Sequence, residues 1–105
     1  MKPDELTKIK GLFTPVFEKL GVRKVILFGS RSRGSETRRS DLDIMVVMDT
    51  EKRFFDRYEQ FEQIQKLIKD RAVDLLIYTP YELDSISHRP FIRRILNEGQ
   101  TIYEC

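Results

Sequence analysis

The amino-acid sequence predicts an α/β (α+β) fold in which a small mixed sheet is flanked by helices. Short apolar segments with the character of buried strands alternate with longer segments whose apolar residues recur at helical spacing. Such alternation is typical of a sheet with helices packed against it. The chain has 105 residues, 40% of them hydrophobic, and it shows no internal repeat and no low-complexity linker. We therefore expect one domain over residues 1–105.

The first predicted element is a helix from Asp4 to Leu20, where apolar residues recur every three or four positions. Gly11 and Pro15 interrupt this pattern, so we expect a kinked or two-part helix. Gly21 is suited to cap the C-terminal end of this helix.

Three apolar segments, residues 24–28, 42–48 and 72–78, predict buried strands. The first two are separated by the polar, arginine-rich residues 30–40, which predict a loop with space for one short helical turn. The second and third are separated by residues 52–69, whose apolar stripe predicts an amphipathic helix.

The C-terminal part of the chain predicts two further helices and a last strand. Thr79 is a suitable N-cap, and Pro80 a suitable first-turn residue, for a short helix. A second helix is predicted over residues 90–97, and it ends at Gly99. Residues 101–103 can form the last strand.

Charge, hydropathy and cysteine content exclude several classes of function. The net charge of +2 is too small to indicate nucleic-acid binding through bulk electrostatics, so we expect no nucleic acid as a direct partner. No apolar run is long enough to span a bilayer, and the polar N-terminus lacks the apolar stretch of a secretory signal. The single cysteine, Cys105, provides neither an internal disulfide nor a metal cluster. We expect a cytoplasmic protein with no membrane partner.

Two carboxylates stand at the start of the second predicted strand. Asp41 and Asp43 are two residues apart, so their side chains project from the same face of the strand. Like charges held this close repel each other unless a cation lies between them, and Mg²⁺ prefers such hard oxygen ligands. Asp74 can complete the set if its strand lies beside that of the pair. Three converging carboxylates could hold two metal ions and stabilise in-line displacement at phosphorus.

A phosphate-binding turn is predicted directly after the first strand. Gly29 allows the backbone to come close to a phosphate, and a helical turn that begins at Ser30 would direct free N–H groups toward it. Arg31 or Arg33 could offset the charge of a triphosphate. Gly34 would permit the tight turn that returns the chain toward the carboxylates.

These motifs resemble the signature of the polymerase-β-like nucleotidyltransferase superfamily. The signature is a Gly-Ser pair, a spacer, Arg-Gly, a second spacer and Asp-x-Asp; here it corresponds to residues 29–30, 33–34 and 41–43. Within the superfamily the chain is most similar to the minimal nucleotidyltransferases known as MntA-type antitoxins, which are paired with HEPN-domain toxins. The resemblance covers nearly the whole chain. One departure is Ser32, which stands where alanine is more frequent.

The resemblance implies roles for individual residues. Gly29 and Ser30 would bind the triphosphate, Asp41 and Asp43 would ligate metal, and Asp74 matches the third carboxylate. Asp74 would ligate one of two Mg²⁺ ions and help to activate the attacking hydroxyl. Family members of this type transfer AMP from ATP to a tyrosine of the partner toxin, which blocks its ribonuclease activity.

Each part of the motif also has a plainer interpretation. Asp41 and Asp43 could be the solvated start of a strand, Asp74 an edge residue that faces water, and residues 29–30 an ordinary turn. The combination at this spacing favours function over these separate interpretations. It identifies phosphate and metal ligands, and it does not predict which base is bound.

The remaining polar residues of interest are less distinctive. Arg33 is the loop arginine that we expect to contact the nucleotide, because it lies inside the motif. Arg38 and Arg39 are interpreted as surface residues or partner contacts. The single histidine, His88, is assigned no role.

We therefore expect a metal-dependent nucleotidyltransferase that transfers AMP from ATP to a protein acceptor, with a HEPN-type toxin as partner. A chain of 105 residues can hold the nucleotide half of an active site but has little left to enclose a second substrate. The acceptor is therefore expected on another chain. The alternative is a binding module that neutralises its partner by occlusion and keeps only a vestigial nucleotide site.

Overall fold

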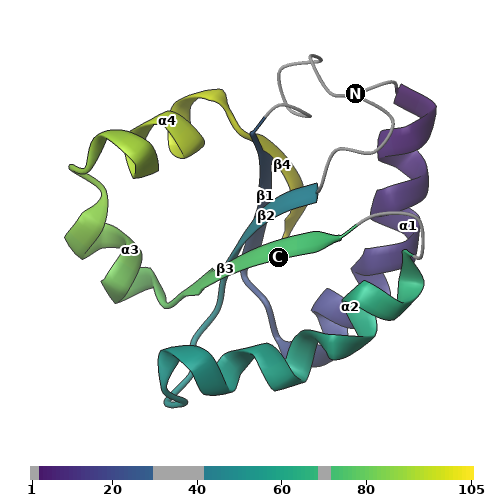
Figure 1. The fold of residues 1–105 in the computed structure, drawn as a ribbon, viewed down its shortest axis with the longest axis horizontal. Helices are drawn as coiled ribbons and strands as arrows, with labels where there is room; N and C mark the ends of the chain where they lie inside the picture. Colours follow the sequence, from purple (N-terminus) through teal and green to yellow (C-terminus); the bar gives the residue numbers. More distant parts are fainter. Residues whose placement is uncertain (1–2, 30–41, 69–71) are drawn as a thin grey trace.

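The computed structural model describes residues 3–29, 42–68 and 72–105. These residues form one four-stranded sheet with helices on both faces (Figure 1), which confirms the predicted α/β class. The elements in chain order are α1 (Pro3–Leu20), β1 (Lys24–Phe28), β2 (Leu42–Val47), the 3₁₀ helix η1 (Phe54–Phe61), α2 (Glu62–Leu67), β3 (Val73–Tyr78), α3 (Pro80–Ile86), α4 (Pro90–Glu98) and β4 (Gln100–Glu104). None of the helices in these ranges is long and apolar enough to cross a membrane.

The sheet is mixed, with strand order β3-β2-β1-β4. β1 is antiparallel to both of its neighbours, β2 and β4, whereas β2 and β3 run parallel. Parallel neighbours need a crossover connection, and η1 with α2 supplies it. The two central strands therefore come from the most apolar segments of the chain, because both of their faces are covered by helices.

Two apolar cores lie on opposite faces of the sheet. Successive side chains of a strand point to opposite faces, so Val25 and Leu27 of β1 join the larger core while Ile26 joins the smaller one. The larger core lies against α1, η1 and α2 and includes Phe13, Phe17, Ile44, Phe61 and Ile64. The smaller core lies against α3 and α4 and includes Met45, Ile92 and Ile95.

α1 is one helix that continues through Gly11 and Pro15, so of the predicted kinked or two-part helix the two-part form is wrong. Phe13 and Phe17, on either side of the proline, are fully buried against the sheet. Burying each of them stabilises the helix by about 1.5–3 kcal/mol, which offsets the roughly 3 kcal/mol that an interior proline costs. The predicted cap at Gly21 is confirmed by its φ of 71°.

The continuous helix predicted over residues 52–69 is also wrong, because its first half winds as the 3₁₀ helix η1. The apolar stripe of this segment does not reveal that Arg57 is buried, with 4% of its surface exposed. Its Nε donates to the carbonyl of Lys52 at 3.0 Å, and its Nη1 donates to the carbonyl of Ile77 at 3.0 Å. These bonds hold the segment against the end of β3.

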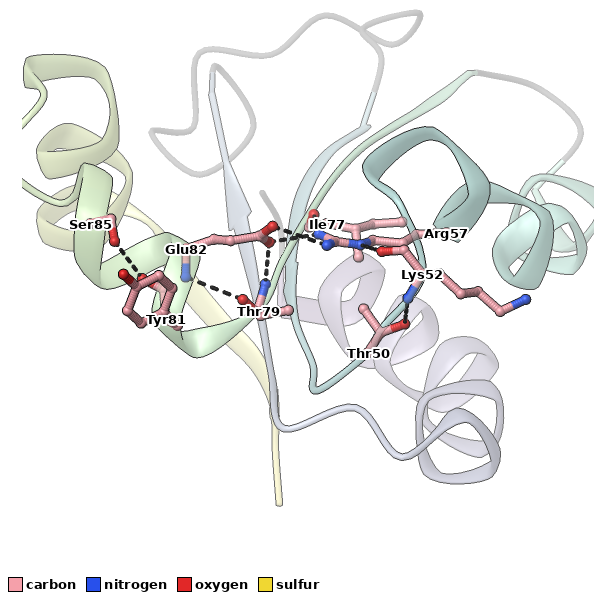
Figure 2. Close-up of polar contacts among 8 residues, drawn as sticks. All are labelled: Thr50, Lys52, Arg57, Ile77, Thr79, Tyr81, Glu82 and Ser85. Carbon is pink, nitrogen blue, oxygen red and sulfur yellow. Dashed lines mark hydrogen bonds and ion pairs between the residues drawn. The ribbon is translucent and has the colours of Figure 1, made fainter.

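The Arg57 guanidinium also forms a two-pronged ion pair with Glu82 of α3 (Figure 2). The two nitrogen–oxygen distances are 2.7 and 3.0 Å. Glu82 and Thr79 form a reciprocal capping box, which confirms Thr79 as the N-cap of α3. The Arg57 guanidinium, and then the backbone N–H of Thr79, lower the pKa of Glu82 from 4.5 to about 2. One carboxylate thus ties α3 to η1.

Replacing Glu82 with Gln is expected to lower the thermal midpoint at pH 7 and to have little effect near pH 2. The folded pKa of Glu82 is depressed, so its stabilising contribution is complete above pH 4.5 and is lost as the pH falls toward 2. The Glu82 side chain is 39% exposed, and after screening by solvent we expect a loss of about 1–2 kcal/mol at pH 7.

Melting curves of wild type and Glu82→Gln at pH 7 and near pH 2 test this expectation. Glu59→Gln, which replaces an exposed glutamate of η1, is the control and should melt like wild type at both values. A gap between wild type and Glu82→Gln that persists at the lower pH would contradict an ionic origin.

Candidate functional site

Two predicted site carboxylates lie side by side in the sheet. Asp43 of β2 and Asp74 of β3 are direct partners in the parallel register, so the strand of Asp74 does lie beside that of Asp43. Asp43 shares a strand face with Met45, which packs into the core under α4. Asp43 is half-buried and Asp74 is exposed.

Gly29 brings the backbone against the Asp43 carboxylate. Its φ of 80° is a left-handed conformation that favours glycine. A Cβ placed on Gly29 would lie 2.5 Å from Oδ2 of Asp43. Phe28, the preceding residue, is the cross-strand partner of Asp43. Glycine therefore suits this backbone conformation, and its lack of a side chain leaves the Asp43 carboxylate undisplaced.

Three predicted site residues, Ser30, Arg33 and Asp41, lie outside the described residues, as do Arg38 and Arg39. The structure therefore brings together Gly29, Asp43 and Asp74 and leaves the other assignments as predictions. Within the described ranges, no three histidine, cysteine or acidic side chains form a group suited to a metal ion. His88 is exposed in the turn between α3 and α4.

A pocket of about 330 Å³ opens beside Gly29 and Asp43. Its wall on the sheet is formed by these two residues and Phe28. Its other wall is the α4 face with Gly99, and the lining residues there are Phe91, Arg94, Ile95, Glu98 and Gly99. Pockets of this volume are at the lower end of those that bind small molecules.

Gly99 determines how closely α4 approaches the sheet. A Cβ at this position would lie 2.4 Å from Cγ2 of Ile26 and 2.4 Å from the carbonyl oxygen of Ile95. The helix can therefore end directly against β1, which places its pocket-lining face opposite Asp43. The sequence predicted Gly99 as a helix end but not this contact.

Sequence reasoning assigned no role to the α4 face of the pocket. Phe91, Arg94 and Glu98 are separated by three and four residues, and this spacing places them on one side of a helix. This spacing can be read from the sequence, but it does not indicate which surface of the protein the helix faces. The direction of α4 depends on the packing of Ile92 and Ile95 against the sheet.

The described part of the site has the ligand chemistry of a divalent-cation site. Asp43 and Asp74 offer carboxylate oxygens from neighbouring positions on one face of the sheet. Mg²⁺ is commonly held by one or two carboxylates, with water or substrate phosphate completing its coordination. The absence of a side chain at Gly29 lets the Asp43 carboxylate lie directly against the backbone there.

The nucleotidyltransferase domain family model matches residues 9–102 of the chain. The match extends from α1 into β4 and includes every residue of the site described above. The chain therefore belongs to the nucleotidyltransferase domain family and is a nucleotidyltransferase, an enzyme whose substrate is a nucleotide.

Sequence relatives include two proteins of Methanocaldococcus jannaschii, each named "Putative protein adenylyltransferase". One is 30% identical over 95 residues, which are 90% of this chain and 94% of the relative. The other is 37% identical over 75 residues, which are 66% of this chain and 74% of the relative.

Solved structures share the fold. A crystal structure of a toxin–antitoxin with AMP-PNP superimposes with a TM-score of 0.66 at 21% identity, covering 91% of this chain and 73% of that chain. A complex of tri-AMPylated Shewanella oneidensis HEPN toxin with MNT antitoxin gives a TM-score of 0.59 at 14% identity, covering 95% of this chain and 73% of that chain. At these identities the likeness establishes the fold alone.

Replacing Gly29 with Ala is expected to reduce nucleotide binding and transferase activity about ten-fold or more, because the new methyl must displace the Asp43 carboxylate. Gly21→Ala is a matched control. Gly21 has a similar φ of 71°, but a Cβ there meets nothing within 4 Å.

Both alanine variants should lose roughly 1–2 kcal/mol of stability from backbone strain, and only Gly29→Ala should lose function. Thermal melts and titration with a non-hydrolysable ATP analogue distinguish the two effects. Equal nucleotide affinity in the two variants would show that close approach at Gly29 is irrelevant to binding.

Proposed function

We propose that this nucleotidyltransferase transfers AMP from ATP to the hydroxyl group of a tyrosine on a HEPN-type ribonuclease toxin. By modifying the toxin in this way it would act as an antitoxin. The register of Asp43 with Asp74, beside the close backbone at Gly29, carries the chemical part of the proposal. The names of the sequence relatives support a protein acceptor. The structural neighbours in toxin–antitoxin complexes support the kind of partner.

The nucleotide would lie between the turn after β1 and the acidic sheet edge. Gly29 and Ser30 would bind the triphosphate, and Arg33 would offset part of its charge. Asp43, together with Asp41 and Asp74, would hold two Mg²⁺ ions. Bound Mg²⁺ would neutralise phosphate charge and polarise the phosphorus under attack.

The two described carboxylates are suited to different sides of the reaction. Asp43 is half-buried against Gly29, which suits contact with the nucleotide. Asp74 is exposed on β3, an edge strand of the sheet, so a side chain from another protein can reach it. We assign Asp43 to the nucleotide and Asp74 to the acceptor.

The transfer is an in-line displacement at the α-phosphorus of ATP. The acceptor oxygen forms a bond to this phosphorus, and the bond from the phosphorus to the bridging oxygen of the β-phosphate breaks. Pyrophosphate leaves, and the hydroxyl proton passes to the Asp74 carboxylate. Most of the catalytic effect in such transfers comes from positioning and charge neutralisation, which matches a site built from a fixed backbone and acidic side chains.

Replacing Asp43 with Asn is expected to lower transferase activity roughly a hundred-fold or more, because a metal-ligating charge is lost. In chelator the variant should be at least as heat-stable as wild type, since one of two neighbouring negative charges is removed at nearly constant shape. Magnesium with ATP should raise the melting midpoint of wild type by linkage, and should raise that of the variant much less.

Melting curves in chelator and in magnesium-ATP, beside an activity assay, test this expectation. Asp56→Asn, which replaces an exposed aspartate of η1, is the matched control and should behave like wild type throughout. An Asp43→Asn variant that melts well below wild type in chelator would assign the carboxylate a structural role.

The acceptor is tested by the intact mass of the toxin partner after incubation with this protein, ATP and magnesium. AMP-sized increments are expected with wild type and should be lost with Asp74→Asn, because the hydroxyl is no longer activated. A Tyr→Phe change at the modified toxin residue should abolish them as well.

Co-expression of the two chains should also relieve the growth arrest that the toxin causes. Inhibition of the toxin at unchanged mass would instead support the occluding module. Undiminished modification of the Tyr→Phe toxin would overturn the tyrosine assignment.

A further inference from the structure

The α4 wall of the pocket carries an aromatic ring and an ion pair that the proposed chemistry does not use. Phe91, Arg94 and Glu98 all line the pocket, while Ile95 between them is buried in the core and fixes the helix. This wall faces the half-buried Asp43 from a different element of the fold. It is therefore placed to contact a substrate whose phosphates lie near Asp43.

Phe91 presents an aromatic surface inside a concave site. The residue is 54% exposed, although its ring contacts that of Phe28 edge-to-face, with ring centroids 5.9 Å apart. Leu96, on the same helix, is 40% exposed but does not line the pocket. An open aromatic face in a pocket is a platform on which a nucleobase can stack, and larger purine rings bury more of it.

Arg94 supplies a cation that is only weakly held. Its Nε lies 3.5 Å from a carboxylate oxygen of Glu98, and both side chains are largely exposed. Such helical pairs are worth only about 0.3–0.5 kcal/mol. A phosphate accepts charge-assisted hydrogen bonds from a guanidinium that are stronger than this pair, so the side chain can exchange Glu98 for a phosphate.

We propose that the α4 wall selects the nucleotide, with the Phe91 ring stacked on a purine base and the Arg94 guanidinium paired with a phosphate. Glu98 holds the guanidinium toward the pocket when no substrate is bound. The inference rests on the proposed function in one respect, namely that the pocket takes a nucleoside triphosphate. It adds the base preference that the phosphate- and metal-binding motif leaves open.

Calorimetric titrations of the full chain with two probes in the presence of magnesium test the assignment. The probes are a non-hydrolysable ATP analogue and inorganic tripolyphosphate, which has no base. Phe91→Ala should weaken binding of the ATP analogue about ten-fold or more and leave tripolyphosphate binding unchanged. Arg94→Gln should weaken both about five- to ten-fold.

The same helix offers a matched control for each change. Leu96→Ala removes an exposed apolar side chain outside the pocket, and Arg93→Gln removes an exposed guanidinium outside it. Both should bind the two probes like wild type. Phe91→Leu keeps the apolar volume but removes the aromatic face, so it replaces the alanine variant if that variant does not fold. It too should weaken binding of the ATP analogue and leave binding of tripolyphosphate unchanged.

The outcomes separate this inference from the proposed function. Phe91 variants that bind the ATP analogue as tightly as Leu96→Ala does would overturn the stacking role of Phe91. So would Phe91 variants with a raised KM for the protein acceptor and an unchanged affinity for ATP. Arg94→Gln behaving like Arg93→Gln would overturn the phosphate contact. A wild-type chain that binds neither probe would overturn the proposed function, and this inference with it.

Discussion

The parallel pairing of β2 with β3 is the constraint on which the site depends. This pairing sets Asp43 opposite Asp74, and a slip of one residue would turn the Asp74 side chain to the other face of the sheet. Local sequence does not enforce the register, because β2 and β3 are joined by a crossover rather than a tight turn. The crossover is fixed by burial of Phe61 and Ile64 in the larger core and by the bonds of Arg57 to β3 and α3.

Much of the fold could be predicted because its strands and helix caps depend on residues that are close together in the sequence. β1, β2 and β3 are short apolar runs, Thr79 caps α3 with its side chain, Gly21 ends α1 with a positive φ, and Gly99 follows the last residue of α4. That Asp43 and Asp74 lie next to each other could be predicted only on the condition that their two strands are adjacent. Strand adjacency depends on packing across the whole domain, and periodicity in one segment does not determine it.

The features that sequence reasoning missed all depend on long-range contacts. Arg57 of η1 is buried, and two of its partners, Ile77 and Glu82, lie 20 and 25 residues away. An arginine in a polar position of a helical pattern predicts only exposure. The α4 wall was missed for the same reason. Its composition was visible in the sequence, but the surface that it faces is decided by Gly99 and by the smaller core.

The smaller core gives α3 and α4 few buried contacts with the sheet, so their position depends on anchors at the two ends of the pair. At one end, the Glu82 carboxylate ties the start of α3 to Arg57. At the other, Gly99 lets the end of α4 rest on β1 and continue into β4. Both anchors act on the helix pair whose second member, α4, carries Phe91 and Arg94, whereas the carboxylates are held by the sheet itself. The sheet therefore fixes the register of Asp43 with Asp74, and the anchored helix pair fixes the distance between Asp43 and the opposite wall of the pocket. Under the proposed role of α4 in nucleotide selection, changes on this helix alter substrate choice and leave the register of Asp43 and Asp74 intact.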